Sequence, residues 1–159
     1  IDDDHLLKTG NWLGPCLTAS AEEGVKELLL LGYHGKLVKL AGGIFHTHHH
    51  LADGRLEILM ALAVRESLPI DWIHNLGNSK SMESALCALE ANQPEAAEQL
   101  WQRIASEVEK RSSAYIENFG SYPIEIGTAL FDGSRRLRWS GAVGMRLLER
   151  LGYLLEADP

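Results

Sequence analysis

The chain has 159 residues and a formal net charge of −7, because 22 acidic residues outnumber 15 Lys and Arg. A hydrophobic share of 45% and a charged share of 23% are ordinary globular values, which exclude global disorder. The acidic balance argues against a nucleic-acid or membrane partner, since binding phosphate requires clustered Lys and Arg, and no apolar run reaches the ~20 residues that span a bilayer.

This length predicts one domain over residues 1–159. The chain does not begin with Met, so we expect it to be a piece of a longer protein. It shows no signal peptide, which predicts a cytoplasmic location. Cys16 and Cys87 lie far apart and in no metal-binding spacing, so we expect two reduced, buried thiols.

The amino-terminal part predicts a strand, a helix and a second strand in succession. Residues 5–9 read as a short strand, and a helix of about three turns then ends near Gly24. The apolar run over residues 26–31 lies between Gly24 and Gly32 and is typical of a buried strand. In parallel sheets, ligands bind outside the carboxyl ends of the strands. The segment that follows this strand, from Gly32 to Lys36, is therefore the place to look for function.

The middle of the chain is expected to be mostly helical. Residues 53–66 place their apolar side chains on one face of a helix, and Ser81 can cap a helix that runs to Ala91. Between these helices, residues 71–73 are expected to form a further short strand. Pro94 opens a long amphipathic helix. We expect its polar side to be solvated and to hold Glu107, Glu109, Lys110 and Arg111.

The carboxy-terminal part predicts a β-hairpin and a last helix. Residues 122–131 alternate in hydrophobicity like a strand, and residues 135–139 can pair back on it after a turn. Residues 142–155 predict an amphipathic helix whose apolar face could contact a second copy of the chain in a homo-oligomer. The expected solvated face of the hairpin carries Arg135, Arg136 and Arg138. These elements together predict a three-layer α/β fold with a mostly parallel, Rossmann-like sheet, a late β-hairpin and a carboxy-terminal helix.

One window of the sequence carries most of its chemical information. Residues 28–52 hold no Asp or Glu, yet they include two lysines and five of the seven histidines. Lys36 and Lys39 lie three residues apart and so share one side of a helix, which suits an anionic ligand with several carboxylates. A solvated lysine pair on a connecting helix fits this spacing equally well. Four glycines in the window allow a tight turn or a close approach of backbone to ligand, namely Gly32, Gly35, Gly42 and Gly43.

The histidines of this window allow a second interpretation. His46 and His48 fall on one side of an extended segment, as metal ligands on strands do, and His50 or Asp53 could complete a site. That arrangement would suit a metal-dependent hydrolase. We favour polar histidines that line a cleft, because further acidic ligands at suitable spacing are not apparent. The sequence also lacks the dinucleotide, P-loop and G-x-S-x-G motifs.

Two segments resemble the cobalt-precorrin-5B C(1)-methyltransferase family of anaerobic cobalamin biosynthesis. They are LLGYHGKLVKLAGGIFHTH, residues 30–48, and ADGRLEIL, residues 52–59, with weaker likeness at NWLG (11–14) and ALFD (129–132). Tyr33 stands where the family usually has His, and His49 where it usually has Ser. Family members carry a further amino-terminal domain, so the chain resembles their carboxy-terminal portion.

The resemblance implies an enzyme that transfers a methyl group from S-adenosylmethionine to carbon 1 of a tetrapyrrole. Cobalt would enter only as part of this substrate, and no resident metal is expected. The implied binding residues for the tetrapyrrole carboxylates are Lys36, Lys39, Thr47 and Arg55, and those for the cofactor are Gly32, Gly35, Gly42 and Gly43. His48 is the implied catalytic residue, with an orienting or proton-handling role, whereas Asp53 is expected to cap the following helix.

Two alternatives to this function stay open from the sequence. The first is a binding module that holds its ligand but is inactive without the missing amino-terminal domain. The second is the metal-dependent hydrolase that would use His46 and His48.

Overall fold

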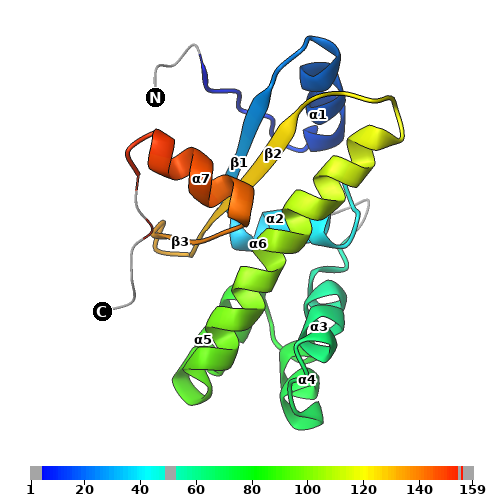
Figure 1. Ribbon diagram of the computed structural model, residues 1–159. Helices are drawn as coiled ribbons and strands as arrows, with labels where there is room; N and C mark the ends of the chain where they lie inside the picture. Colours follow the sequence, from blue (N-terminus) through cyan, green and yellow to red (C-terminus); the bar gives the residue numbers. More distant parts are fainter. Residues whose placement is uncertain (1–4, 49–52, 154, 156–159) are drawn as a thin grey trace.

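The computed structural model describes residues 5–48, 53–153 and 155 (Figure 1). Within these residues it has seven helices and three strands. In chain order they are α1 (Leu13–Glu22), β1 (Glu27–Tyr33), α2 (His34–Ala41), α3 (Arg55–Arg65), α4 (Ile70–Gly77), α5 (Met82–Asn92), α6 (Pro94–Glu117), β2 (Glu125–Phe131), β3 (Leu137–Ser140) and α7 (Ala142–Arg150). No helix in this part of the chain is both long enough and apolar enough to cross a bilayer.

The three strands form one mixed sheet in the order β1-β2-β3. β1 runs parallel to β2, with Leu28 opposite Ile126, and β3 runs antiparallel to β2, with Trp139 opposite Leu130. The α/β class and the late hairpin are therefore confirmed, whereas the three-layer, Rossmann-like arrangement is not. The connection between the parallel strands β1 and β2 contains all the helices from α2 to α6.

The core lies between this sheet and the long helix α6, which crosses most of the molecule in Figure 1. The apolar stripe of α6 is fully buried and contacts α2, α5 and β2. α3, α4 and α5 extend beyond the sheet (Figure 1), where α3 and α5 contact α6 and α4 contacts α3 and α5. The buried stripe of α6 comprises Leu100, Trp101, Ile104 and Val108.

Two predicted strands are absent from the described residues, and the predicted end of the last helix is wrong. Residues 6–9 have no regular structure, and residues 71–73 lie inside helix α4. In α4 the helical spacing of Ile73 and Leu76 buries both side chains, which the short run over 71–73 did not reveal. The last helix ends at Arg150 rather than at residue 155, because Gly152 adopts a φ of +77° that stops the helix.

Several side chains expected on the surface are buried. Glu107 and Glu109 on α6 are only 6% and 9% exposed, and Arg138 on β3 is 7% exposed and pairs with Glu90 at 2.7 Å. The prediction of a solvated side for both elements is therefore wrong at these positions. Cys87 departs in the opposite sense, because it is exposed rather than buried.

Glu109 joins three elements around β2. Its carboxylate accepts hydrogen bonds from the backbone N–H of Thr128 at 3.0 Å, Gly144 at 2.7 Å and Val143 at 3.2 Å. Val143 and Gly144 lie in the first turn of α7, where the helix leaves N–H groups without an internal partner. Buried negative charge is favourable at this end of a helix. Glu109 thus fixes α6, β2 and α7 relative to one another.

Candidate functional site

A hollow of about 210 Å³ lies beside the carboxyl end of β1. Tyr33 is the last residue of β1, and helix α2, which carries two lysines, begins at the next residue. Chain segments before α1 and after α2 supply the rest of the wall. The residues that line this cationic hollow are Asn11, Tyr33, Gly35, Lys36, Lys39, Thr47 and Arg55.

The two lysines of the cationic hollow are held by backbone oxygens. Lys39 is 2% exposed, and its Nζ donates a hydrogen bond to the carbonyl oxygen of Thr47 at 3.2 Å. Burial lowers the pKa of Lys39, since desolvation disfavours the ammonium form. Lys36 is half-buried, and its Nζ donates to the carbonyl oxygen of Gly10. Both ammonium groups are therefore positioned in this wall before any ligand arrives.

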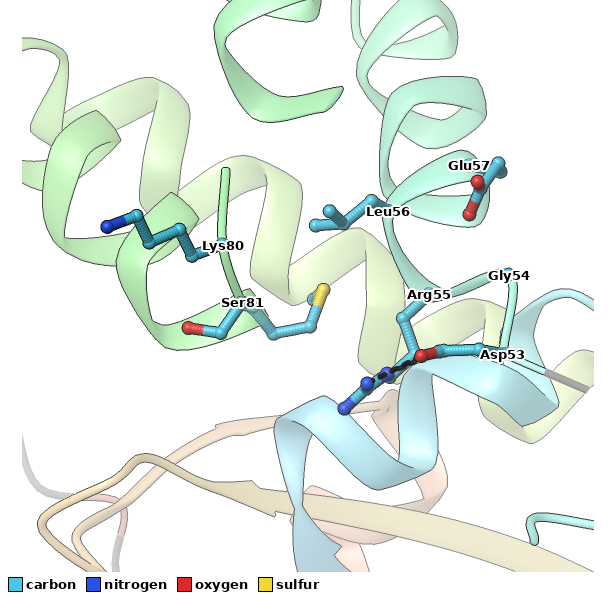
Figure 2. A pocket seen from close by; sticks show the side chains of 8 residues that line it. Asp53, Gly54, Arg55, Leu56, Glu57, Lys80 and Ser81 are labelled. Carbon is cyan, nitrogen blue, oxygen red and sulfur yellow. Dashed lines mark hydrogen bonds and ion pairs between the residues drawn. The ribbon is translucent and has the colours of Figure 1, made fainter. Parts of the chain in front are cut away.

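Arg55 lies where the cationic hollow meets a second hollow of about 230 Å³. Its guanidinium donates to both carboxylate oxygens of Asp53, from Nε to Oδ1 at 2.5 Å and from Nη2 to Oδ2 at 2.7 Å (Figure 2). This pairing lowers the pKa of Asp53 and raises that of Arg55. Asp53 was expected to cap α3, and this prediction is wrong. The capping residue is Gly54, and no side chain caps that helix.

The second hollow lies between the starts of α3 and α5 and carries both signs of charge. Its lining residues are Asp53, Gly54, Arg55, Leu56, Glu57, Lys80, Ser81 and Met82. Figure 2 shows that the Lys80 side chain extends away from Arg55. The positive charges that converge are therefore those of the cationic hollow.

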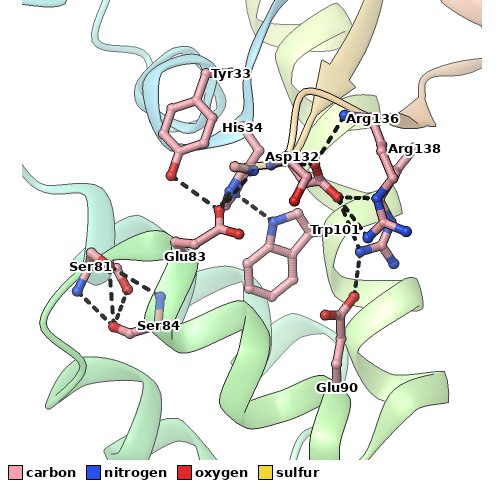
Figure 3. A network of polar contacts seen from close by, with 12 residues as sticks. Tyr33, His34, Ser81, Glu83, Ser84, Glu90, Trp101, Asp132, Arg136 and Arg138 are labelled. Atoms are coloured by element: carbon pink, nitrogen blue, oxygen red, sulfur yellow. Dashed lines mark hydrogen bonds and ion pairs between the residues drawn. The ribbon is translucent and has the colours of Figure 1, made fainter.

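Tyr33 is fixed in the wall of the cationic hollow by Glu83 on α5. Its hydroxyl donates a hydrogen bond to Oε2 of Glu83 at 3.2 Å (Figure 3). Burial and the Glu83 carboxylate raise the pKa of Tyr33 to about 12, so the phenol stays protonated at neutral pH. The same carboxylate oxygen accepts from the backbone N–H of Gly133 in the hairpin turn at 3.1 Å.

His34, the first residue of α2, is completely buried behind this wall. The indole Nε1–H of Trp101 donates to its Nδ1 at 2.9 Å, and its Nε2 lies 2.8 Å from Oε2 of Glu83. Since Nδ1 accepts a hydrogen bond, the proton of the neutral ring is on Nε2 and is donated to Glu83. Burial is the main cause that lowers the pKa of His34. A neutral imidazole therefore joins α2, α5 and α6 beneath the hollow.

This arrangement predicts a loss of stability in mild acid. Because the pKa of folded His34 lies below 6.5, the unfolded state binds its proton first, and stability falls as the pH drops below about 6.5. The substitution His34→Gln keeps hydrogen-bonding atoms but does not titrate. It should lower the free energy of unfolding at pH 7.5 by about 1–3 kcal/mol. The further decrease in this free energy between pH 7.5 and pH 5.5 should be smaller in His34→Gln than in the wild type.

Urea unfolding followed by far-UV circular dichroism at the two pH values measures this difference. His74→Gln is the matched control, because it makes the same substitution at an exposed helical histidine. An equal pH dependence in the wild type and in His34→Gln would contradict the role assigned to His34.

Of the residues proposed from the sequence, one group converges. Lys36, Lys39, Thr47 and Arg55 all line the cationic hollow. Gly35 lines it too, and a Cβ there would approach the Tyr33 ring to 2.6 Å, so this glycine permits that packing.

The other three glycines line neither hollow. A Cβ at Gly32 would lie 2.9 Å from Leu37, and one at Gly42 would collide with Ile58. Gly43 follows α2 with a φ of +82°, which L side chains rarely adopt. Packing and turn geometry thus account for a glycine at each of these positions.

The histidines are placed differently. His48 is half-buried next to Thr47 but lines neither hollow. The exposed ring of His46 lies 5.6 Å from the ring of Trp12. In the part of the chain that the structure describes, no group of three or more His, Cys, Asp or Glu side chains could hold a metal ion. His49 and His50 lie outside the described residues.

Two lining residues were not proposed for the site from the sequence. Asn11 comes from the segment before α1, and its backbone oxygen accepts from the N–H of Thr47 at 3.4 Å, which brings two distant segments together. Tyr33 was noted only as a departure from a family pattern. Its fixed position depends on Glu83, which is 50 residues away in the chain, so no local spacing could indicate it.

The chain is similar in sequence to proteins of known name. A family model described as CbiD, C-terminal domain, matches residues 46–142. Over 154 residues the chain is 63% identical to the cobalt-precorrin-5B C(1)-methyltransferase of Prochlorococcus marinus (strain MIT 9303), a match that covers 97% of this chain and 40% of that protein. The protein of the same name from Synechococcus sp. (strain CC9902) is 59% identical over 138 residues, covering 87% of this chain and 38% of the relative. The chain thus spans about two fifths of the length of these curated relatives. No solved structure matches it.

Proposed function

Because the chain belongs to the cobalt-precorrin-5B C(1)-methyltransferase (CbiD) family as its carboxy-terminal domain, we propose that it supplies the carboxylate-binding part of that enzyme's tetrapyrrole cleft. The proposed reaction transfers a methyl group from S-adenosylmethionine to carbon 1 of cobalt-precorrin-5B. The observation that carries this proposal is the cationic hollow, where Lys36, Lys39, Thr47 and Arg55 line one cavity.

The chemistry of these side chains suits the border of the substrate, which carries acetate and propionate groups. A carboxylate forms short, charge-assisted hydrogen bonds with ammonium and guanidinium groups, and the planar guanidinium can bind it with two parallel bonds. Arg55 already holds Asp53 in this bidentate way. A substrate carboxylate would therefore take the place that the Asp53 carboxylate occupies on Arg55.

Methyl transfer to an electron-rich carbon requires alignment of the sulfonium, the methyl group and the acceptor rather than an enzymatic nucleophile. The fixed wall of the hollow supports this role, since Glu83, His34 and Trp101 hold Tyr33 and the start of α2 in place. We keep Gly32, Gly35, Gly42 and Gly43 as the proposed cofactor segment and His48 as the proposed orienting residue. Of these, only Gly35 lines the hollow.

The size of the hollow favours a shared cleft. At about 210 Å³ it is smaller than the ~300–1,000 Å³ of typical small-molecule pockets, and a tetrapyrrole is a large ligand. The chain also spans only 40% of its relatives. Both observations favour the binding-module candidate, in which this domain holds carboxylates of the tetrapyrrole and the remainder of the protein completes the cleft and is required for turnover.

A methyl-transfer assay tests the proposal. The full-length protein, incubated with cobalt-precorrin-5B and S-adenosylmethionine labelled in its methyl group, should transfer label to the tetrapyrrole. The isolated 159-residue chain should bind the tetrapyrrole in calorimetric titration but transfer no label. Absence of transfer by the full-length protein would overturn the methyltransferase, and absence of binding by both proteins would overturn the binding role.

A further inference from the structure

The outer edge of the sheet at β1 lacks a strand partner in the described part of the chain. β1 pairs with β2 along its whole length, and the sheet order ends there. The main-chain N–H and C=O groups on the other side of β1 therefore face no strand among the described residues. This edge is seven residues long and includes four consecutive leucines, residues 28–31.

One face of β1 is also less covered than the same face of its neighbour. Leu31 is 50% exposed, whereas Ala129, its partner in the register, is fully buried. Leu29 is half-buried, whereas its partner Gly127 is buried and packs against the backbone of Gly144 on α7. Helix α7 thus packs mainly on β2 and leaves the same face of β1, the strand at the edge of the sheet, partly open.

Proteins protect open edges with charged side chains, Pro, bulges or short strands, because a long apolar edge pairs with other chains and aggregates. β1 has none of these protections between Leu28 and Tyr33, and its one charged residue, Glu27, lies at its start. Its pairing with β2 is regular throughout. Such an edge is a ready template for pairing with another strand.

We propose that a strand from the part of the protein that precedes this domain pairs with the outer edge of β1 and covers Leu31. The curated relatives are long enough to supply it, since the matched region is only 40% of their length and the family model describes a C-terminal domain. β1 ends at Tyr33, which lines the cationic hollow. A strand paired with β1 therefore brings the preceding part of the protein to the open side of that hollow, where a larger ligand needs a second wall.

Cysteine footprinting of the full-length protein tests this inference independently of any methyl transfer. In a Cys87→Ser background, which removes an exposed thiol, Leu31→Cys should react with a maleimide at least about tenfold more slowly than a freely exposed thiol. Val64→Cys and Ile70→Cys are matched controls, because these side chains are 59% and 61% exposed on helices α3 and α4, away from the sheet. Reaction of Leu31→Cys as fast as the controls would overturn the proposal.

Two further measurements distinguish what covers the outer edge of β1. Protection of Leu31→Cys that disappears on dilution to a monomer would show that a second copy covers the edge, and this would overturn the proposal. If the variant does not fold, hydrogen exchange of the wild-type protein decides. A paired edge should protect every amide of residues 28–33, whereas an open edge would leave alternate amides exchanging rapidly.

Discussion

Replacing Glu109 with alanine is expected to lower the free energy of unfolding by about 3–5 kcal/mol, the largest single-residue effect on stability that this structure predicts. The carboxylate accepts hydrogen bonds from three backbone N–H groups, those of Thr128, Val143 and Gly144. Removing it leaves these donors without a partner, and each buried unpaired donor costs about 1–3 kcal/mol. Urea unfolding followed by far-UV circular dichroism measures the change.

Lys110→Ala provides the control for this measurement. Lys110 is the next residue of α6 but is exposed, so its replacement should change the stability by less than about 0.5 kcal/mol. A loss below about 1 kcal/mol in Glu109→Ala would mean that water replaces the carboxylate, and that α7 does not depend on it.

The largest effect on function is expected from Arg55→Leu in the full-length protein. The charge-assisted hydrogen bonds of one guanidinium to a carboxylate contribute about 1.5–3 kcal/mol. The KM for the tetrapyrrole should therefore rise about 10–100-fold. The KM for S-adenosylmethionine and the kcat should change much less, because a carboxylate contact that is equally strong in the bound substrate and in the transition state changes only the KM for that substrate. Steady-state kinetics with each substrate varied in turn measures the separation.

Lys80→Met is the matched control for charge. Lys80 lines the neighbouring hollow, yet its side chain extends away from Arg55 (Figure 2). Lys80→Met and Arg55→Leu each remove one positive charge from the same region, so a general electrostatic effect would raise the KM in both variants. An equal rise in the two would contradict a specific carboxylate contact at Arg55.

The elements that sequence patterns predicted correctly are those fixed by neighbouring residues. Ser81 begins α5 through a capping box with Ser84, a contact over three residues, and Pro94 occupies the first position of α6. The convergence of Lys36, Lys39 and Thr47 is also nearly local, because all three lie within one short helix and the irregular segment that follows it. Such contacts can be read from spacing.

The features that were missed depend on contacts between distant parts of the chain. Glu109 belongs to a run of charged residues that predicts a solvated helix side, and its burial follows only from β2 and α7 packing there. Arg138 is buried where Glu90 on α5 and Asp132 in the hairpin turn both pair with its guanidinium. The spacing of charges along one segment does not contain these partners. The strand predicted over residues 26–31 does form, as β1, but the prediction that it is buried was wrong for a related reason. β1 lies at the edge of the sheet, and among its leucines only Leu30 is buried.

The proposed function depends on binding of the tetrapyrrole carboxylates in the cationic hollow. The most direct measurement is a double-mutant cycle in which the wild type and Arg55→Leu each bind the free acid of the tetrapyrrole and its methyl ester. We expect esterification to weaken binding to the wild type by at least about 1 kcal/mol more than it weakens binding to Arg55→Leu, because Lys36 and Lys39 remain in that variant. Effects of the ester and of the substitution that add without coupling would contradict the proposed binding.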